Sequence, residues 1–320
     1  MCSSDLGDVT QAAYLGPWLW KLTVEKAGSF DIDKVAVRRS FDRAAPSYDG
    51  AAVLQREVCE RMLGRLEYVR LAPEIVLDAG SGTGYGARRL RPRYPRARIV
   101  ELDLAPGMLA ASRQQQPWWR RLLPAARGGA SRYACGDIEA LPFRTGSFGL
   151  VWSNLALQWS VQPQQAFAEL LRVLAPGGLL MFSTFGPDTL KELRSVYAEV
   201  DDRPHVSRFP DMHDLGDMLV EARFADPVMD MECITLTYPE VTALMRELKA
   251  IGAHNAAQGR ACGLTGKSRL RAVEAGYERL RRDGRLPATF EVVYGHAWKP
   301  LPRTGPGGRP VIDIKVAGTR

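Results

Sequence analysis

A short apolar run that ends in an acid and leads directly into a glycine-rich turn restricts the fold of this chain more than any other feature. Residues 76–84 read VLDAGSGTG, with glycine at positions 80, 82 and 84. Glycine permits positive φ and lets a ligand approach the main chain closely, and the start of a following helix offers unpaired N–H groups. The segment therefore predicts a strand, a ligand-binding turn and a helix. Taken alone, it is also compatible with a purely structural turn or a dinucleotide site.

Short apolar runs and helical periodicity alternate along the chain, as in a doubly wound sheet. We expect strands at 75–78, 98–103, 131–135, 148–153, 178–184, 226–236 and 289–294. We expect helices at 84–94, 105–115, 163–173, 189–200, 212–221, 240–251 and 268–282. This pattern predicts an α/β fold with a Rossmann-like sheet, helices on both faces and a helical cap insertion at about 240–285. Such sheets bind ligands at the carboxyl ends of their strands.

One domain is expected over residues 31–300, because a chain of 320 residues that is 46% hydrophobic can bury a large core. A helical entry segment at 34–66 precedes the first strand. Residues 1–30 show no useful periodicity and are expected to be a poorly ordered extension. The Pro/Gly-rich residues 301–320 are expected to be a mobile tail, and a second insertion is expected at 116–127.

Cysteine and histidine spacing predicts neither a metal site nor a disulfide framework. The apolar stretch at 12–20 is too short to span a bilayer and contains Gly16 and Pro17. These features favour a cytoplasmic protein without a secretory signal. The net charge of +7 is compatible with a nucleic acid, an anionic membrane or an acidic protein as partner, and it does not choose among them.

Two further expected strands are followed by acids. Asp103 closes the second strand, where a carboxylate can accept both hydroxyls of a ribose. Asp137 follows the third, where it can accept from an exocyclic amine while Ile138 packs on a flat ring. Each acid alone could be a loop residue or a helix cap. Together with Asp78, acids at three successive strand ends predict a nucleoside-binding edge.

Five motifs in this order resemble those of class I S-adenosylmethionine-dependent methyltransferases: DAGSGTG, LDLAPGML, GDIEALPF, SNLALQW and RVLAPGG. The spacing GxGxG, rather than GxGxxG, also favours this cofactor over NAD. The resemblance implies a seven-stranded methyltransferase sheet and S-adenosyl-L-methionine as cofactor. It further implies cofactor-binding roles for Asp78, Gly80, Gly82, Gly84, Asp103, Asp137, Ile138 and Asn154.

Within that set, the backbone at Gly80 and Gly82 would hold the methionine part of the cofactor, with Asn154 beside it. By the same resemblance, Asp103 would hold the ribose. The adenine would lie against Asp137 and Ile138.

A narrower resemblance covers about residues 37–300. The segments RRSFDRAAPSYDGAAVLQREV, FSTFGPDTLKELR, SRFPDMHDLGDMLVEARF and TFEVVYGHAWKP are similar to those of the malonyl-[acyl-carrier-protein] O-methyltransferases of early biotin synthesis. This implies methylation of the free carboxylate of malonyl-acyl carrier protein, which gives a malonyl methyl ester for pimeloyl synthesis. A carboxylate is already ionised at neutral pH, so the chemistry needs alignment and desolvation rather than a strong base.

Four residues are candidates for the catalytic, substrate-facing part of the site. Arg208, in SRFPD after the fifth strand, could bind the malonyl carboxylate through two hydrogen bonds. Tyr48, Gln158 and Trp159 could form pocket walls, with Tyr48 closing over the cofactor. The alternatives are a solvated surface arginine and ordinary core or interface side chains.

Basic residues gather at 260–285, and a stripe of Leu270, Val273, Tyr277 and Leu280 at helical spacing would leave them on an outer face. They are Arg260, Lys267, Arg269, Arg271, Arg279, Arg281, Arg282 and Arg285. This face is a candidate docking surface for an acidic, malonyl-loaded acyl carrier protein. An ordinary solvated helix face is the alternative.

Two other functions stay open at the level of sequence. The chain could methylate a small molecule such as a quinone precursor, or it could be a non-catalytic S-adenosylmethionine-binding assembly factor. Nucleic acid is not an expected partner, because the basic residues are not interleaved with stacking aromatics. A membrane is not expected either, and no pattern indicates the oligomeric state.

Overall fold

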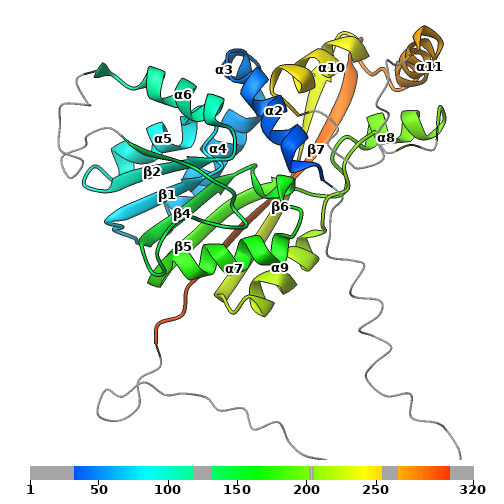
Figure 1. Cartoon of the computed structure of the whole chain (residues 1–320). Helices are drawn as coiled ribbons and strands as arrows, with labels where there is room; N and C mark the ends of the chain where they lie inside the picture. Colours follow the sequence, from blue (N-terminus) through cyan, green and yellow to red (C-terminus); the bar gives the residue numbers. More distant parts are fainter. Residues whose placement is uncertain (1–31, 119–130, 202, 204, 254–265, 303–320) are drawn as a thin grey trace, which may run out of the picture.

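The computed structural model describes residues 32–118, 131–201, 203, 205–253 and 266–302. The extension predicted at 1–30, most of the insertion predicted at 116–127 and nearly all of the tail predicted at 301–320 lie outside these residues. In the described part, seven strands form one sheet between two layers of helices (Figure 1). The predicted α/β class and the Rossmann-like seven-stranded sheet are confirmed.

The sheet consists of parallel strands completed by an antiparallel pair. The strands are β1 Ile75–Ala79, β2 Arg98–Asp103, β3 Arg132–Cys135, β4 Phe148–Asn154, β5 Leu174–Phe185, β6 Ala225–Tyr238 and β7 Leu286–Trp298. Their order is β3-β2-β1-β4-β5-β7-β6, and β7 runs antiparallel to both of its neighbours.

The helices follow the predicted alternation, and the entry segment forms three separate helices. They are α2 Lys34–Ala44, α3 Tyr48–Ala51, α4 Val53–Leu66, α5 Tyr85–Arg93, α6 Pro106–Gln115, α7 Pro163–Val173, α8 Lys191–Ala198, α9 Met212–Glu221, α10 Val241–Ala250 and α11 Lys267–Glu278, with a 3-10 turn, η3, at Leu157–Trp159. Asp33 begins α2 by accepting a hydrogen bond from the Ala36 N–H at 3.0 Å. Asp211 begins α9 in the same way, through the His213 N–H at 2.7 Å.

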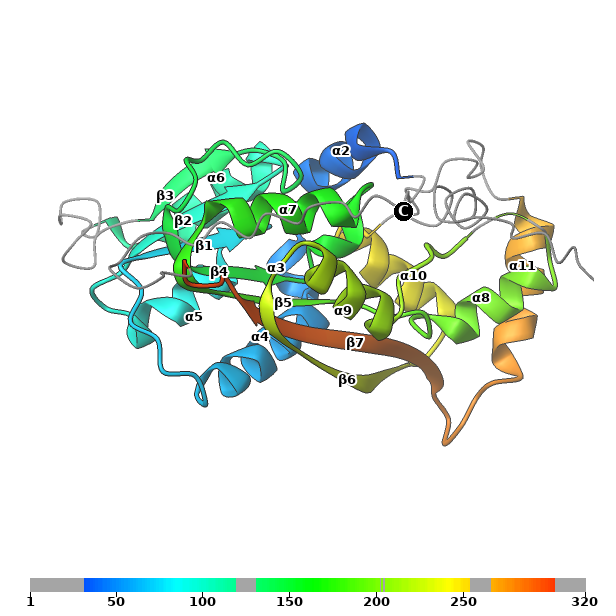
Figure 2. The same ribbon diagram turned by 90° about the horizontal axis from the view of Figure 1, so that it is seen from below.

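Neighbouring residues of each central strand pack against opposite helical layers. Val76 and Leu150 belong to the core on the side of α4 and α5. Leu77 and Val151 belong to the core on the side of α7 and α9 (Figure 2). Because both faces are covered, these strands are continuous apolar runs, and this is why they can be predicted from sequence.

Two strands, β5 and β7, extend three or more residues past a predicted end. β5 begins at Leu174 rather than residue 178, because a register shift lets Leu174 pair with Phe148. β7 extends beyond the predicted 289–294 on both sides, because its pairing with β6 continues from Leu286 to Trp298. Gly295 lies inside β7, where a Cβ would overlap the Phe182 ring. The glycine therefore marks close packing within the strand and not the end of the strand.

The two helices of the predicted cap insertion take different positions. α10 contacts α3 and β6, whereas α11 contacts α8 and α10. Leu244 of α10 and Val273 and Tyr277 of α11 are buried. Both helices are therefore packed parts of the structure, and the predicted domain boundaries stay predictions.

Among the described residues, no helix is long and apolar enough to cross a membrane. The cysteines in these ranges, Cys59, Cys135 and Cys233, carry free thiols. No group of three or more histidine, cysteine, aspartate or glutamate side chains there is arranged to hold a metal ion.

The turn between β1 and α5 is left-handed at each of its glycines. The φ angle is +79° at Gly80, +54° at Gly82 and +79° at Gly84. A Cβ on Gly84 would overlap Ser112 Oγ and lie 2.7 Å from Glu101 Oε2. Those two side chains are buried and hydrogen-bonded to each other. The third glycine is therefore required for packing the turn against α6.

We expect Gly84→Ala to lower the free energy of unfolding by about 2–5 kcal/mol, because it adds both left-handed strain and an overlap in the core. Gly146→Ala is the matched control, because Gly146 has a φ of +72° but no atom within 4 Å of the added Cβ. That variant should lose only about 1–2 kcal/mol. Urea unfolding of both variants measures the difference, and equal losses would contradict the packing role of Gly84.

Candidate active site

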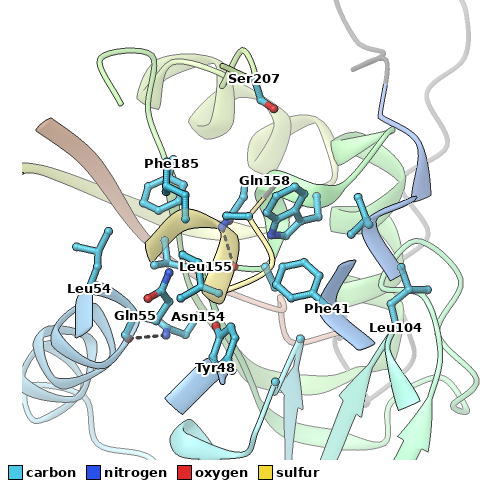
Figure 3. A pocket seen from close by; sticks show the side chains of 18 of the residues that line it. Phe41, Tyr48, Leu54, Gln55, Leu104, Asn154, Leu155, Gln158, Phe185 and Ser207 are labelled. Atoms are coloured by element: carbon cyan, nitrogen blue, oxygen red, sulfur yellow. Dashed lines mark hydrogen bonds between the residues drawn. The ribbon is translucent and has the colours of Figure 1, made fainter. Parts of the chain in front are cut away.

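A pocket opens at the carboxyl ends of β1, β2 and β4, where α2, α3 and α10 approach the sheet (Figure 3). Six of the eight predicted cofactor-binding residues line it: Gly80, Gly82, Asp103, Asp137, Ile138 and Asn154. Three of the four predicted catalytic residues also line it: Tyr48, Gln158 and Trp159. The structure thus brings together residues that are up to 111 positions apart, from Tyr48 to Trp159.

Main-chain hydrogen bonds fix the glycine turn against β2. The N–H groups of Gly80 and Ser81 donate to the Leu102 carbonyl oxygen at 2.8 and 2.9 Å. A Cβ on Gly80 would overlap that of Ala156, whereas the nearest atom to a Cβ on Gly82 is Tyr48 Cε1, at 3.9 Å. Gly82 therefore presents its main chain to open space in the pocket.

Asp103 joins the end of β2 to the glycine turn. Its Oδ2 accepts from the Gly82 N–H at 2.8 Å, and its Oδ1 accepts from the Ala105 N–H at 2.9 Å. Burial raises the pKa of Asp103 to about 6, although these N–H groups oppose the shift. Each carboxylate oxygen can accept more than one hydrogen bond, so hydroxyl groups of a ligand can still bind here.

The loop after β3 is tied to the entry segment by a lysine. Lys34 Nζ lies 2.5 Å from Asp137 Oδ2 and 2.7 Å from Glu139 Oε2. Asp137, Ile138 and Lys34 all line the pocket. Lys34 could not be predicted from sequence, because a single lysine on an amphipathic helix gives no signal of its partner 103 residues away.

Asn154, at the end of β4, is held by two hydrogen bonds. Its Nδ2 donates to the Gln55 carbonyl oxygen at 3.0 Å, and its Oδ1 accepts from Ser183 Oγ at 2.9 Å. The next residue, Leu155, has a φ of 48°, which is unusual for a residue other than glycine. Leu190, with a φ of 54°, also lines the pocket. Left-handed leucines at two points of the wall mark backbone that the surrounding packing holds in place.

Aromatic rings from three elements form one wall. Phe41 contacts Trp159 edge-on, with ring centroids 5.3 Å apart, and its ring centroid lies 6.5 Å from that of Tyr48. Burial, followed by the charge of Asp103, raises the pKa of Tyr48, so its hydroxyl stays protonated at neutral pH. In Figure 3, Asn154 and Leu155 lie between Gln55 on one side and Phe41 on the other.

The opposite end of the pocket is apolar and was not predicted. It is lined by Phe185, Leu193, Val206, Phe209, Leu248 and Phe290, from β5, α8, the segment before α9, α10 and β7. The Phe185 ring lies 5.6 Å from Phe209 and 5.9 Å from Phe290, between centroids. α10 therefore covers the pocket as the predicted cap should, whereas α11 contributes none of its described residues to the lining.

Three predicted site residues are not among those that line the pocket. Asp78 is buried beneath the turn, and burial with the nearby Glu101 raises its pKa. Gly84 faces α6, as described above. Arg208 is exposed, although its neighbours Ser207 and Phe209 line the pocket. Asp78 and Gly84 therefore support the glycine turn from outside the pocket. Arg208 differs from Ser207 and Phe209 because its side chain is exposed to solvent.

The polar end of the pocket fits S-adenosylmethionine, the cofactor that the sequence motifs imply. Asp103 can accept ribose hydroxyls, and Asp137 can accept an adenine amine. Gln55 Oε1 and Gln158 Oε1 are buried without a hydrogen-bond partner among the described residues, although both side chains line the pocket. Unpaired buried acceptors call for a donor, and the cofactor's ammonium group has the required chemistry.

Comparison with known proteins agrees with this geometry. Residues 77–182 match a family described as a methyltransferase domain. A solved structure from Bacillus halodurans, provisionally named a methyltransferase, superposes with a TM-score of 0.52 at 20% identity, covering 76% of this chain and 99% of that one. At that identity the superposition shows the fold alone, and the fold and the matched domain define a class I methyltransferase.

Curated relatives are much closer in sequence. The malonyl-[acyl-carrier protein] O-methyltransferase of Laribacter hongkongensis is 60% identical over 290 residues, which cover 89% of this chain and 97% of the relative. The protein of the same name from Gallionella capsiferriformans is 56% identical over 283 residues, covering 88% and 97%. This chain therefore belongs to the malonyl-[acyl-carrier protein] O-methyltransferase family.

The raised pKa of Asp103 predicts how cofactor binding depends on pH. The ionised carboxylate accepts ribose hydroxyls, and it is lost as the pH falls through about 6. The affinity for S-adenosylmethionine should therefore be level well above that pH and weaken by about tenfold per pH unit well below it. Isothermal titration between pH 5 and 8 measures this. Asp103→Asn should bind more weakly but without the acid-side fall, and an identical fall in that variant would assign the titration to another group.

Proposed function

We propose that this protein transfers a methyl group from S-adenosylmethionine to the free carboxylate of malonyl-acyl carrier protein. The product is the malonyl methyl ester, which would enter biotin synthesis through a pimeloyl chain. The observation that supports this most is one continuous pocket with two unlike ends. Acids at the ends of strands line its polar end. Six apolar side chains from five segments of the chain line its apolar end.

S-adenosylmethionine, when bound, would supply the methyl group: a carboxylate oxygen would bond to the methyl carbon as the carbon–sulfur bond of the sulfonium breaks, which would leave S-adenosylhomocysteine and the ester. The residues of the chain bind and align the reactants. The turn at Gly82 and the carboxylate of Asp103 hold one reactant in a fixed position. Phe185, Phe209 and Phe290 exclude water from the other end, which raises the reactivity of a carboxylate that is already ionised. No group in this scheme has to remove a proton.

The direct test is methyl transfer from labelled S-adenosylmethionine to malonyl-acyl carrier protein, with malonyl-coenzyme A and succinyl-acyl carrier protein as parallel substrates. We expect base-labile label on the malonyl carrier protein and much less on the other two. Asp103→Ala should reduce the rate of transfer at limiting cofactor by at least about tenfold. The substitution removes the carboxylate that would accept two charge-assisted hydrogen bonds from the ribose hydroxyls of the cofactor.

Cofactor binding without transfer to any acyl thioester would contradict the proposal and favour a non-catalytic role. Methylation of a quinone precursor in the absence of any carrier protein would favour a small-molecule methyltransferase.

We further propose that α11 and the turn that follows it, up to residue 285, carry the docking surface for the acidic carrier protein. Of the basic residues at 260–285, Arg260 lies outside the described residues, and three others form ion pairs: Arg269 with Asp201, Arg279 with Glu199 and Arg281 with Glu278. Arg271 and Arg282 are exposed and have no ion pair within the described ranges. Their charges are therefore available to an acidic partner.

The double variant Arg271→Glu/Arg282→Glu should raise the KM for malonyl-acyl carrier protein by about tenfold at low salt and leave kcat unchanged, because it replaces attraction by repulsion at the surface. Arg96→Glu/Arg132→Glu is the control, because it changes the net charge by the same amount. Both arginines are exposed, and they lie next to β2 and on the edge strand β3, at the end of the sheet remote from β7 and β6. Equal effects of the two variants would show that net charge, rather than the α11 surface, controls binding.

A further inference from the structure

The pocket contains few side chains that can bind a substrate carboxylate. Among the described residues that line it, the basic side chains are Lys34 and His205. Lys34 is already bound by Asp137 and Glu139, at 2.5 and 2.7 Å. His205 belongs to the same short segment as Val206 and Phe209, which line the apolar end. It is therefore the basic group placed with the residues expected to surround the acyl group.

His205 is held in one orientation by two neighbours. Its Nε2 lies 2.7 Å from Asp201 Oδ1, and its ring stacks on Tyr197 with centroids 3.8 Å apart and an interplanar angle of 12°. The histidine side chain is 17% exposed and the aspartate side chain 14%, so the pair is largely shielded from solvent. A packed ring with one nitrogen committed to a carboxylate presents its other nitrogen at a fixed position.

Asp201 is itself arranged to stay ionised. The hydrogen bond with His205, followed by the one from the Arg203 N–H, holds the pKa of Asp201 below its ordinary value. Arg269 Nη1 lies 3.3 Å from Asp201 Oδ2. When the ring carries a proton on both nitrogens, Nε2 donates to Asp201 Oδ1 and Nδ1–H can donate to an anion. With Arg269 and a bound carboxylate, the four charges of this group sum to zero.

We infer that His205, oriented by Asp201, binds the free carboxylate of the malonyl thioester and thereby selects an acyl group that ends in an acid. This inference rests on the proposed function. One carboxylate oxygen accepts from the ring, and the other stays available to take the methyl group. The apolar side chains around the site strengthen this contact, because a charge pair interacts more strongly where water is excluded. A carboxylate entering this apolar end without such a partner would not be stably bound.

Binding of acyl carrier proteins in the presence of S-adenosylhomocysteine, which prevents turnover, tests the inference. The wild-type protein should bind the malonyl form more tightly than the acetyl form. His205→Ala should weaken binding of the malonyl form by about 10- to 100-fold and leave binding of the acetyl form unchanged. His205→Gln, which keeps a neutral N–H donor of similar size, should retain part of the preference.

His213→Ala is the matched control. His213 also pairs with an aspartate, since its Nδ1 lies 2.7 Å from Asp211 Oδ1, but its side chain is 85% exposed and it does not line the pocket. This variant should keep the full preference for the malonyl form. Unchanged affinity for S-adenosylhomocysteine shows that a variant is folded. If His205→Ala does not meet this criterion, the preference of His205→Gln for the malonyl form over the acetyl form tests the inference.

A folded, active protein whose preference for the malonyl form survives in both His205 variants would overturn the inference. If Arg208→Ala removed that preference instead, the carboxylate would be assigned to Arg208. Absence of methyl transfer by the wild-type protein would be a different result, because it would contradict the proposed function itself.

Discussion

The hydrogen bonds that Asp103 accepts from the main chain organise the rest of the site. One carboxylate receives the Gly82 N–H from the glycine turn and the Ala105 N–H from the start of α6, at 2.8 and 2.9 Å. Because Gly80 and Ser81 also donate to the Leu102 carbonyl oxygen, the turn cannot move independently of β2. The main chain that faces the ligand and the acid that faces the ligand therefore form a single rigid unit. α2 and α3 then close against this unit, which places Tyr48 beside Gly82.

The nucleoside end of the site could be predicted because its chemistry is local in sequence. Asp103 is the last residue of β2, Gly82 lies three residues after β1 and Asp137 two residues after β3, and parallel strands bring their carboxyl ends to one edge. Local sequence did not predict the full length of β7. Gly295 looks like a strand end in the sequence, but it lies inside β7 because it packs closely against Phe182 of the neighbouring strand β5. No window of sequence around a glycine contains that information.

The substrate end could not be predicted in this way, because its residues come from segments without a shared pattern. Its chemistry makes Arg208 a candidate, whereas His205, three residues earlier, has no metal-binding spacing that would indicate a role. Burial separates them, because His205 lines the pocket and Arg208 is exposed. Lys34 likewise acquires its importance only through acids on a loop more than 100 residues away. At the substrate end, residue type alone identifies several candidates for binding the carboxylate. Only the folded structure shows which of them line the pocket.

The position of β7 between β5 and β6 has a consequence for the order in which the molecule can assemble during translation. Strands β1 to β4 and the nucleoside end are encoded before residue 155, so this half can form while later residues are still being synthesised. The apolar end includes Phe290 of β7 and cannot be completed until residues 286–298 have left the ribosome. Until then β5 is an open sheet edge, able to pair with another chain. The order of synthesis thus allows the cofactor end to form before the substrate end.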